Sequence, residues 1–182
     1  QCPVCLELMH KPVFNSCGHA FCFWCAHLAM DPVAVSRCPI CRAAVAHLPA
    51  PCVPLAQHIA SALPRAAARR AAEVARLERE RYHSSSPVVP VGDPGWACAA
   101  CWQRVRCAPC VTVCGHVLCG PCVPSEADAT CPQCDARLVY RPGPSRLLAE
   151  LLGVEATVGE GGAAPAGGQS PAPAPADGWG PA

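Results

Sequence analysis

The sequence predicts two small α+β modules that are stapled by bound metal ions, joined by a helical segment and followed by a disordered tail. Three observations support this fold class. Seventeen cysteines occur among 182 residues. The order Cys-x-His-x-x-Cys-x-x-Cys appears twice, in SCGHAFCFWC (16–25) and in VCGHVLCGPC (113–122). Large apolar residues are sparse, because much of the 52% hydrophobic fraction is alanine and cysteine, so burial alone would not offset the chain entropy of such small modules.

Disulfide bonds are the alternative staple for a cysteine-rich chain, and three features argue against them. The number of cysteines is odd. The cysteines are grouped as CxxC pairs, many with a proline beside them, and a histidine recurs at a fixed offset. A disulfide framework has no use for that histidine, whereas zinc binds thiolate and imidazole together. The pattern therefore predicts zinc sites.

The first module is predicted over residues 1–44 and contains eight ligands, enough for two tetrahedral zinc ions. They are Cys2, Cys5, Cys17, His19, Cys22, Cys25, Cys38 and Cys41. Four protein ligands leave no position for water, so hydrolysis at the metal is not expected. The sequence also shows no nucleophile elbow, phosphate-binding glycine loop or carboxylate pair. Any catalysis would have to act through a partner.

A helical segment and a flexible linker are predicted over residues 45–95. Apolar residues recur at helical spacing up to Leu63, and a second helical period follows Pro64. The second helix is rich in arginine and glutamate, which indicates a solvated face with intrahelical ion pairs; a docking or dimerising helix is the alternative. The stretch HSSSPVVPVGDPG, residues 83–95, has the composition of a linker.

The second module is predicted over residues 96–140 and repeats the pattern, which brings the expected number of zinc ions to four. Its ligands are Cys98, Cys101, Cys114, His116, Cys119, Cys122, Cys131 and Cys134. Cys107 and Cys110 are surplus and are interpreted as loop thiols, with a third metal site or an exchange of ligands as alternatives. Cys52 stands alone at a helix start and is interpreted as a small buried apolar residue.

The remaining segments are short. Residues 141–158 predict a capped helix between Ser145 and Gly153, and residues 159–182, almost entirely Gly, Ala and Pro, predict a disordered tail. The chain opens at Gln1, directly before the first CxxC, so we expect a piece of a longer protein. No uncharged apolar run of about 18 residues occurs, so no membrane span is expected. The net charge of +1 gives no reason to expect nucleic acid.

The ligand order of both modules resembles that of RING domains. This resemblance implies a cross-brace, in which the first and third ligand pairs hold one zinc ion and the second and fourth pairs hold the other. It also implies a function, since RING domains are mostly ubiquitin ligases. They hold a ubiquitin-conjugating enzyme charged with ubiquitin and position the ubiquitin for attack by a substrate lysine, with no covalent intermediate on the ligase itself.

The resemblance further implies a docking surface for the conjugating enzyme on the first module. Its residues are Val4 inside the first CxxC, Leu28 and Ala29 after the sixth ligand, and Pro39 and Ile40 in the last CPxC. Arg42 follows the last ligand and is the candidate for a cation that bridges ubiquitin and the conjugating enzyme, because a guanidinium can donate to carbonyls on two proteins. An ordinary surface arginine is the alternative.

The second module differs at these places. Ala100 replaces the apolar docking residue, Glu126 falls in the expected helix, and Asp135 follows the last ligand. A small side chain offers less contact, and an acid cannot act as the bridging cation. We therefore expect the first module to recruit the conjugating enzyme and the second to bind a substrate, a partner or its sibling module.

A narrower resemblance covers residues 1–153. CPVCLELMHKPV, SCGHAFCFWCAHLAM and RCPICR, followed by the helices and a second RING, resemble the plant PROTEOLYSIS type of N-degron ubiquitin ligase. This resemblance implies substrates with an aromatic N-terminal residue, their polyubiquitination and their degradation. The ZZ-type zinc module of that family is not found in these 182 residues, and no residue is assigned to a degron pocket.

Several properties are left open by the sequence. The sequence does not decide whether the protein forms a homodimer. It also does not identify the conjugating enzyme, the substrate or the ubiquitin chain linkage. Cytosol or nucleus is expected, because the thiols must stay reduced. A zinc-dependent scaffold that assembles partners without promoting transfer is the alternative function.

Overall fold

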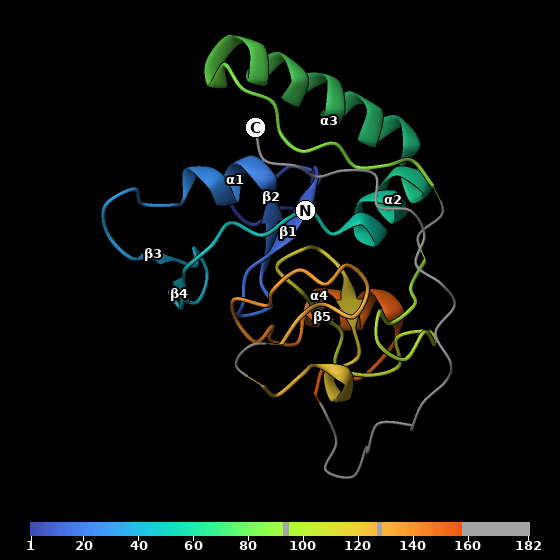
Figure 1. Cartoon of the computed structure of the whole chain (residues 1–182). Coiled ribbons are helices and arrows are strands. Elements are labelled where there is room, and N and C mark those ends of the chain that lie inside the picture. The colour runs from blue at the N-terminus through green and yellow to red at the C-terminus, as the bar shows by residue number, and fades with distance from the viewer. Residues whose placement is uncertain (93–94, 127–128, 158–182) are drawn as a thin grey trace.

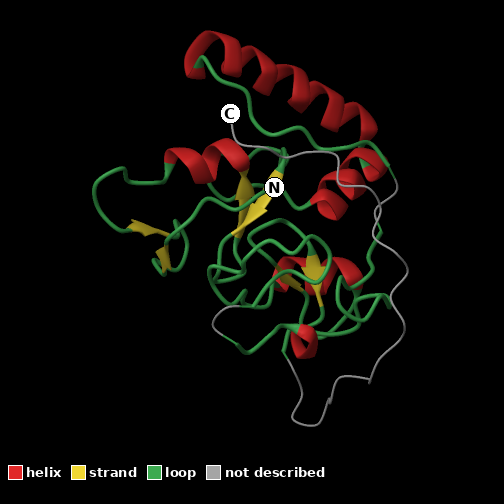
Figure 2. Cartoon of the chain, in the orientation of Figure 1, coloured by secondary structure: helices red, strands yellow, loops and turns green. Residues whose placement is uncertain are grey.

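The structure, a computed structural model, describes residues 1–92, 95–126 and 129–157. The first module, drawn in blue, lies under a long green helix, and the second module, drawn in yellow to orange, lies on the side away from that helix (Figure 1). Helices and short strands are mixed in both modules (Figure 2), which confirms the predicted α+β class. The predicted disordered tail, residues 159–182, lies outside the described residues.

The first module is built on a short hairpin. Its elements are β1 (Pro12–Phe14), β2 (Ala20–Cys22), α1 (Phe23–Leu28), β3 (Ser36–Arg37) and β4 (Ala44–Val45). β1 pairs antiparallel with β2, and both strands are buried throughout, with Phe14 and Phe21 at the centre. A two-stranded hairpin of this length is at best marginally stable alone, so its order depends on the ligands that flank it.

The second module repeats the hairpin with different flanks. Its elements are β5 (Cys110–Val111), β6 (Val117–Leu118), the 3-10 helix η2 (Gly120–Cys122) and α4 (Arg146–Leu152). The expected helix around Glu126 is wrong, because the described residues between η2 and α4 form no α-helix and Glu126 lies in a bend. Pro121 and Pro124 lack the N–H groups that a continuing helix would need.

The capped helix expected after the second module is confirmed as α4. The Ser145 hydroxyl accepts a hydrogen bond from the backbone N–H of Leu148 at 3.3 Å. Gly153 then closes the helix with a positive φ of 65°, a conformation that costs glycine nothing. Leu148 itself is fully buried, and Ser145 N donates to the carbonyl of Pro109 at 2.8 Å, which ties the start of the helix to the second module.

Two helices form the segment between the modules, as predicted. They are α2 (Val53–Ala62) and α3 (Pro64–Leu77), and α3 continues into a π-helical turn, η1 (Glu78–Tyr82). Leu63 leaves the helical region, with φ −132° and ψ 57°, immediately before Pro64. The expected intrahelical ion pairs occur between Arg70 and Glu73, at 2.7 Å, and between Arg76 and Glu80, at 2.9 Å.

The segment expected to be a flexible linker instead packs back along the helices over residues 86–92. Ser86 is buried, and its hydroxyl accepts a hydrogen bond from Lys11 Nζ at 2.7 Å. Further along, Gln57 Nε2 donates to the carbonyl of Pro90 at 3.0 Å. Composition indicated a linker here, but these contacts come from residues far away in the sequence.

The two modules touch each other directly. Buried residues of both belong to one apolar cluster. The chain that follows each module also crosses to the other, because Ala50 N donates to the carbonyl of Val113 and Gly143 N donates to the carbonyl of Ser16, each at 2.7 Å. Within the described residues, no helix combines the length and the apolar character needed to cross a membrane.

Candidate metal centres

The sixteen cysteine and histidine side chains meet in four groups, each with its ligand atoms within 4.8 Å of one another. We call them zinc site 1 (Cys2, Cys5, Cys22, Cys25), zinc site 2 (Cys17, His19, Cys38, Cys41), zinc site 3 (Cys98, Cys101, Cys119, Cys122) and zinc site 4 (Cys114, His116, Cys131, Cys134). The first and third ligand pairs of each module combine, as do the second and fourth. The cross-brace is therefore confirmed in both modules.

The spacing of these ligand atoms fits tetrahedral zinc. With Zn–S bonds of about 2.3 Å and Zn–N bonds of about 2.0 Å, two sulfurs lie roughly 3.8 Å apart and a sulfur and a nitrogen roughly 3.5 Å apart. The sulfurs of Cys5 and Cys22 are 3.9 Å apart. His19 Nδ1 lies 3.3 and 3.6 Å from two partner sulfurs, and His116 Nδ1 lies 3.3, 3.4 and 3.5 Å from its three. Three thiolates with one imidazole, or four thiolates, are zinc ligand sets.

A repeated backbone turn places the ligands. In four CxxC turns the backbone N–H after the second cysteine donates to the carbonyl of the first cysteine at 2.9 Å. The donors are Leu6, Arg42, Trp102 and Asp135, with φ of 61°, 60°, 58° and 54°. A left-handed φ is uncommon outside glycine, and here it lets two thiols of one turn face a single ion. Arg42 and Asp135 thus occupy the same place in the two modules.

The thiols of each group differ in acidity. In zinc site 4, a hydrogen bond from Cys114 lowers the pKa of Cys131 to about 3. Burial acts in the opposite direction, and a hydrogen bond with His116 lowers this pKa further. The hydrogen bond with Cys131, together with burial, raises the pKa of Cys114 above its usual value. In zinc site 1, hydrogen bonds from Cys22 and Cys25 lower the pKa of Cys2. Zinc binds the thiolate form, so binding of the ion displaces the thiol protons of each group.

Arg70 of α3 contacts zinc site 1 from outside. Its NH2 donates to Cys5 Sγ at 3.5 Å, its NH1 pairs with Glu73, and its side chain is only 11% exposed. Burial opposes the charge, but Glu73 and the sulfurs of Cys5 and Cys22 raise the pKa of Arg70. Zinc with four thiolates carries about two net negative charges, so a buried guanidinium offsets part of that charge. Sequence periodicity alone did not indicate which arginine turns inward.

The side chains expected to dock the conjugating enzyme are exposed. The exposed fractions of Val4, Leu28 and Ile40 are 45%, 62% and 50%. Ala29, Pro39 and Arg42 are exposed as well. Leu6, which the sequence reading passed over, is 72% exposed beside the same CxxC. These side chains are not needed by the core, and their docking roles stay a prediction.

Helix α3 borders this surface. A hollow of about 270 Å³ lies between the first CxxC, α1 and α3, and its lining includes Cys5, Leu28 and Leu77. At the end of α3, Trp24 Nε1 donates to Glu78 at 2.8 Å, and the Trp24 ring lies 4.4 Å from that of Tyr82. The helix is thereby fixed against α1, next to the expected docking residues.

The surplus cysteines belong to none of the four groups. Cys110 is not a loop thiol as expected, since it is a buried residue of β5, and burial raises its pKa to about 12. Cys107 is half-buried, and its backbone forms an isolated parallel β-bridge with that of Glu155. Cys52 is fully buried, as expected, and burial raises its pKa to about 12. In the described part of the chain, none of these three thiols belongs to a group of side chains that could hold a metal ion.

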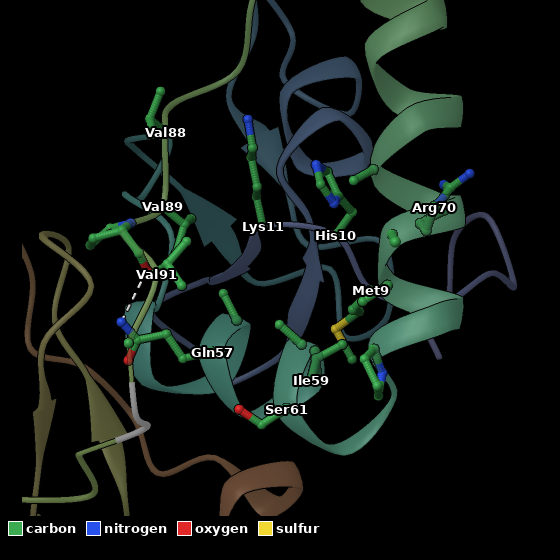
Figure 3. Close-up of a pocket in the computed structure, with 18 residues that line it drawn as sticks. Met9, His10, Lys11, Gln57, Ile59, Ser61, Arg70, Val88, Val89 and Val91 are labelled. Atoms are coloured by element: carbon green, nitrogen blue, oxygen red, sulfur yellow. Dashed lines mark hydrogen bonds between the residues drawn. The ribbon is translucent and has the colours of Figure 1, made fainter.

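A cavity of about 570 Å³ opens between the first module, α2, α3 and residues 88–92 (Figure 3). Its walls are mainly apolar, with Met9, Ile59 and Val89 coming from three different segments of the chain. The charged or titratable residues of its described lining are His10, Lys11 and Arg70, and no carboxylate is among them. An amino group entering this cavity would find no counter-charge.

Comparison with known proteins agrees with this geometry. Residues 1–48 match the family described as Zinc finger, C3HC4 type (RING finger). The E3 ubiquitin-protein ligase PRT1 of Arabidopsis thaliana is 44% identical over 80 residues, 44% of this chain and 20% of that protein. Tripartite motif-containing protein 12A of Mus musculus is 47% identical over 45 residues, 22% of this chain and 16% of that protein.

A third relative is the E3 ubiquitin-protein ligase RNF166 of Mus musculus, 46% identical over 43 residues, 23% of this chain and 18% of that protein. The chain thus spans a fifth or less of the length of these three relatives. No solved structure matches the chain.

Proposed function

Because residues 1–48 form a RING finger, we propose that the chain is the zinc-dependent catalytic part of a RING-type ubiquitin ligase. The observation that carries the proposal is the set of exposed apolar side chains on the metal-held turns and helix α1 of the first module, with Val4, Leu28 and Ile40 between 45% and 62% exposed. A small module gains nothing in stability from exposing them. A docked conjugating enzyme would bury them.

The proposed reaction needs no nucleophile from this chain. When bound, zinc supplies the rigid frame, at an apparent ~10 kcal/mol or more per structural site. The loops of the first module hold the conjugating enzyme, and Arg42 donates to carbonyls of ubiquitin and of the enzyme. The rate gain comes from orienting the thioester for attack by a substrate lysine. We place this activity in the cytosol or nucleus, where thiols stay reduced.

The proposed substrates are proteins with an aromatic N-terminal residue, as the narrower family resemblance implies. The cavity in Figure 3 is not proposed as their binding site, since its described lining holds Lys11 and Arg70 and no carboxylate for the N-terminal amino group. Substrate selection is therefore assigned to a surface outside this cavity.

The second candidate function is a scaffold that binds partners without promoting ubiquitin transfer. Two features favour this function for the second module, but not for the first. Ala100 is half-buried against the core rather than exposed, and Asp135 stands where the first module has Arg42. Purified chain, activating enzyme, a panel of conjugating enzymes, ubiquitin and ATP separate the two functions. We expect ubiquitin chains with at least one conjugating enzyme, and reporters beginning with Phe should be modified before reporters beginning with Met. No transfer with any of them would leave only the scaffold.

A further inference from the structure

The two modules repeat one another beyond their zinc ligands. KPVFNSCGHAFC (11–22) aligns with APCVTVCGHVLC (108–119), and HLPAPC (47–52) aligns with YRPGPS (140–145). Identical residues stand at four non-ligand positions of this alignment, namely Pro12 and Pro109, Gly18 and Gly115, Pro49 and Pro142, and Pro51 and Pro144. All four positions lie in or beside the contact between the modules.

Each crossing contact is made twice, in opposite directions. Ala50, in the segment that follows the first module, donates its N–H to the carbonyl of Val113 in the second. Gly143, in the segment that follows the second module, donates to the carbonyl of Ser16 in the first, both at 2.7 Å. Ala50 aligns with Gly143, and Ser16 aligns with Val113. Equivalent residues therefore exchange the same bond, which is the defining property of a two-fold interface between identical subunits.

The glycines of the two Cys-Gly-His loops follow the same rule. A Cβ on Gly18 would lie 2.2 Å from the carbonyl oxygen of Pro144, and a Cβ on Gly115 would lie 2.3 Å from that of Pro51. The two φ values, 80° and 85°, also agree. The backbone of each module thus presses against the loop that carries two zinc ligands of the other, and only glycine leaves room for it.

The chain returns to its own module immediately after each crossing. Cys52 N donates to the carbonyl of Pro12 at 2.7 Å, and Ser145 N donates to that of Pro109 at 2.8 Å. Cys52 and Ser145 are the N-cap residues of α2 and α4. The repeat therefore includes the module, its crossing segment and the following helix.

The surfaces that differ between the repeats are those assigned to docking. Ile40 aligns with Gln133, Arg42 aligns with Asp135, and α1 is replaced by the shorter η2. The second module also reaches the docking side of the first, because Ile40 shares a hollow of about 580 Å³ with Leu147 of α4. The second repeat keeps the pairing surface and lacks the docking surface.

We propose that the second module is a built-in pairing partner, which occupies on the first module the face where a second copy of the chain would otherwise dock. The protein is then a monomer, because linking two modules gives an effective concentration on the order of millimolar, far above that of a second chain. The second module supports ubiquitin transfer by holding the Cys17–His19 loop of the first. This support for ubiquitin transfer rests on the proposed function, whereas the pairing of the modules does not.

The test uses two interface variants and one control in the intact zinc-loaded chain. Gly143→Val places a side chain where a Cβ would lie 2.8 Å from the carbonyl of Ser16, at a glycine without positive φ. Ala50→Pro removes the opposite crossing N–H between two existing prolines. Gly95→Val is the control, because no atom lies within 4 Å of its Cβ position. The readouts are mass, zinc content and amide hydrogen exchange.

We expect a monomer mass for the unchanged chain from about 1 to about 100 µM, below the effective concentration within the chain. Gly143→Val should speed amide exchange at Gly18, in the other module, by about tenfold, the factor for one hydrogen bond lost. Ala50→Pro should do the same at Gly115, and Gly95→Val should change neither. Discharge of ubiquitin from the conjugating enzyme should slow in Gly143→Val, although every docking residue is intact.

Three results would overturn the pairing: a concentration-dependent dimer, exchange that changes only in the substituted module, or loss of zinc confined to that module. Loss of zinc from both modules in either interface variant would support it. A chain that never discharges ubiquitin with any conjugating enzyme, yet stays monomeric with coupled exchange, contradicts the proposed function and leaves the pairing standing.

Discussion

Arg70→Met removes the guanidinium that contacts zinc site 1, and its expected effect is weaker zinc binding at that site alone. The NH2 group lies 3.5 Å from Cys5 Sγ. At an effective dielectric constant of about 20, two unit charges at this distance interact by roughly 5 kcal/mol. Burial of the guanidinium and its sharing with Glu73, at 2.7 Å, reduce the net contribution.

Substitutions outside the ligand shell usually cost about 10- to 100-fold in metal affinity, or ~1.4 to 2.7 kcal/mol. We expect the lower end of that range for Arg70→Met, since Glu73 already shares the guanidinium. Methionine keeps much of the length and apolar volume of the arginine stem, so the change acts mainly through charge and hydrogen bonding.

The assay is competition for zinc with a chromophoric chelator, which counts the ions released as chelator is added. One ion of four should leave Arg70→Met about tenfold more easily than it leaves the unchanged chain. Arg69→Met is the matched control, because Arg69 is exposed on the same helix and contacts no ligand in the structure. Identical release curves for the two variants, or a loss spread evenly over all four ions, would refute the reasoning.

The remaining predictions concern docking, metal and thiols. Ile40→Ala should weaken binding of the conjugating enzyme by about five- to tenfold, as expected when a half-exposed aliphatic side chain becomes buried, whereas Gln133→Ala should have no effect in the same titration; equal losses would contradict the division between the modules. Arg42→Ala should slow ubiquitin discharge in single-turnover assays more than it weakens binding, with Asp135→Ala as the silent counterpart, and a pure binding defect would count against the bridging role. Native mass spectrometry should find four zinc ions, and their chelation should abolish the native circular dichroism; an unchanged spectrum would show that an apolar core suffices. Cys52 should resist alkylation at pH 8, because a pKa of about 12 leaves only about one thiolate in ten thousand, and rapid modification in the folded chain would disprove its burial.

Much of the metal framework follows from the sequence alone. Fixed spacing between Cys17 and His19, or between two cysteines of one turn, leaves little conformational choice once an ion must be surrounded, and the RING resemblance supplies the pairing. The cap at Ser145 and the break before Pro64 are likewise local. Such features depend on residues a few positions apart, and the structure shows them where they were expected.

What the sequence did not predict depends on contacts between distant residues. Arg70 is placed by its contact with Cys5, which lies 65 positions earlier. The order of residues 86–92 depends on Lys11 and Gln57, which no local pattern connects to them. The missing second copy of α1 could have been anticipated, since Pro124 follows closely after the sixth ligand. The segment after Cys122 is too short for apolar periodicity to distinguish a helix from a loop.

The left-handed turn that follows each CxxC has a consequence for how such proteins change over time. At Arg42 and Asp135 the backbone N–H closes the turn, and the residue is exposed. A substitution there by a residue that is not β-branched alters what the surface recognises and keeps the backbone turn. After an internal duplication, one copy could therefore lose its original specificity by single substitutions and persist as a well-folded companion of the other.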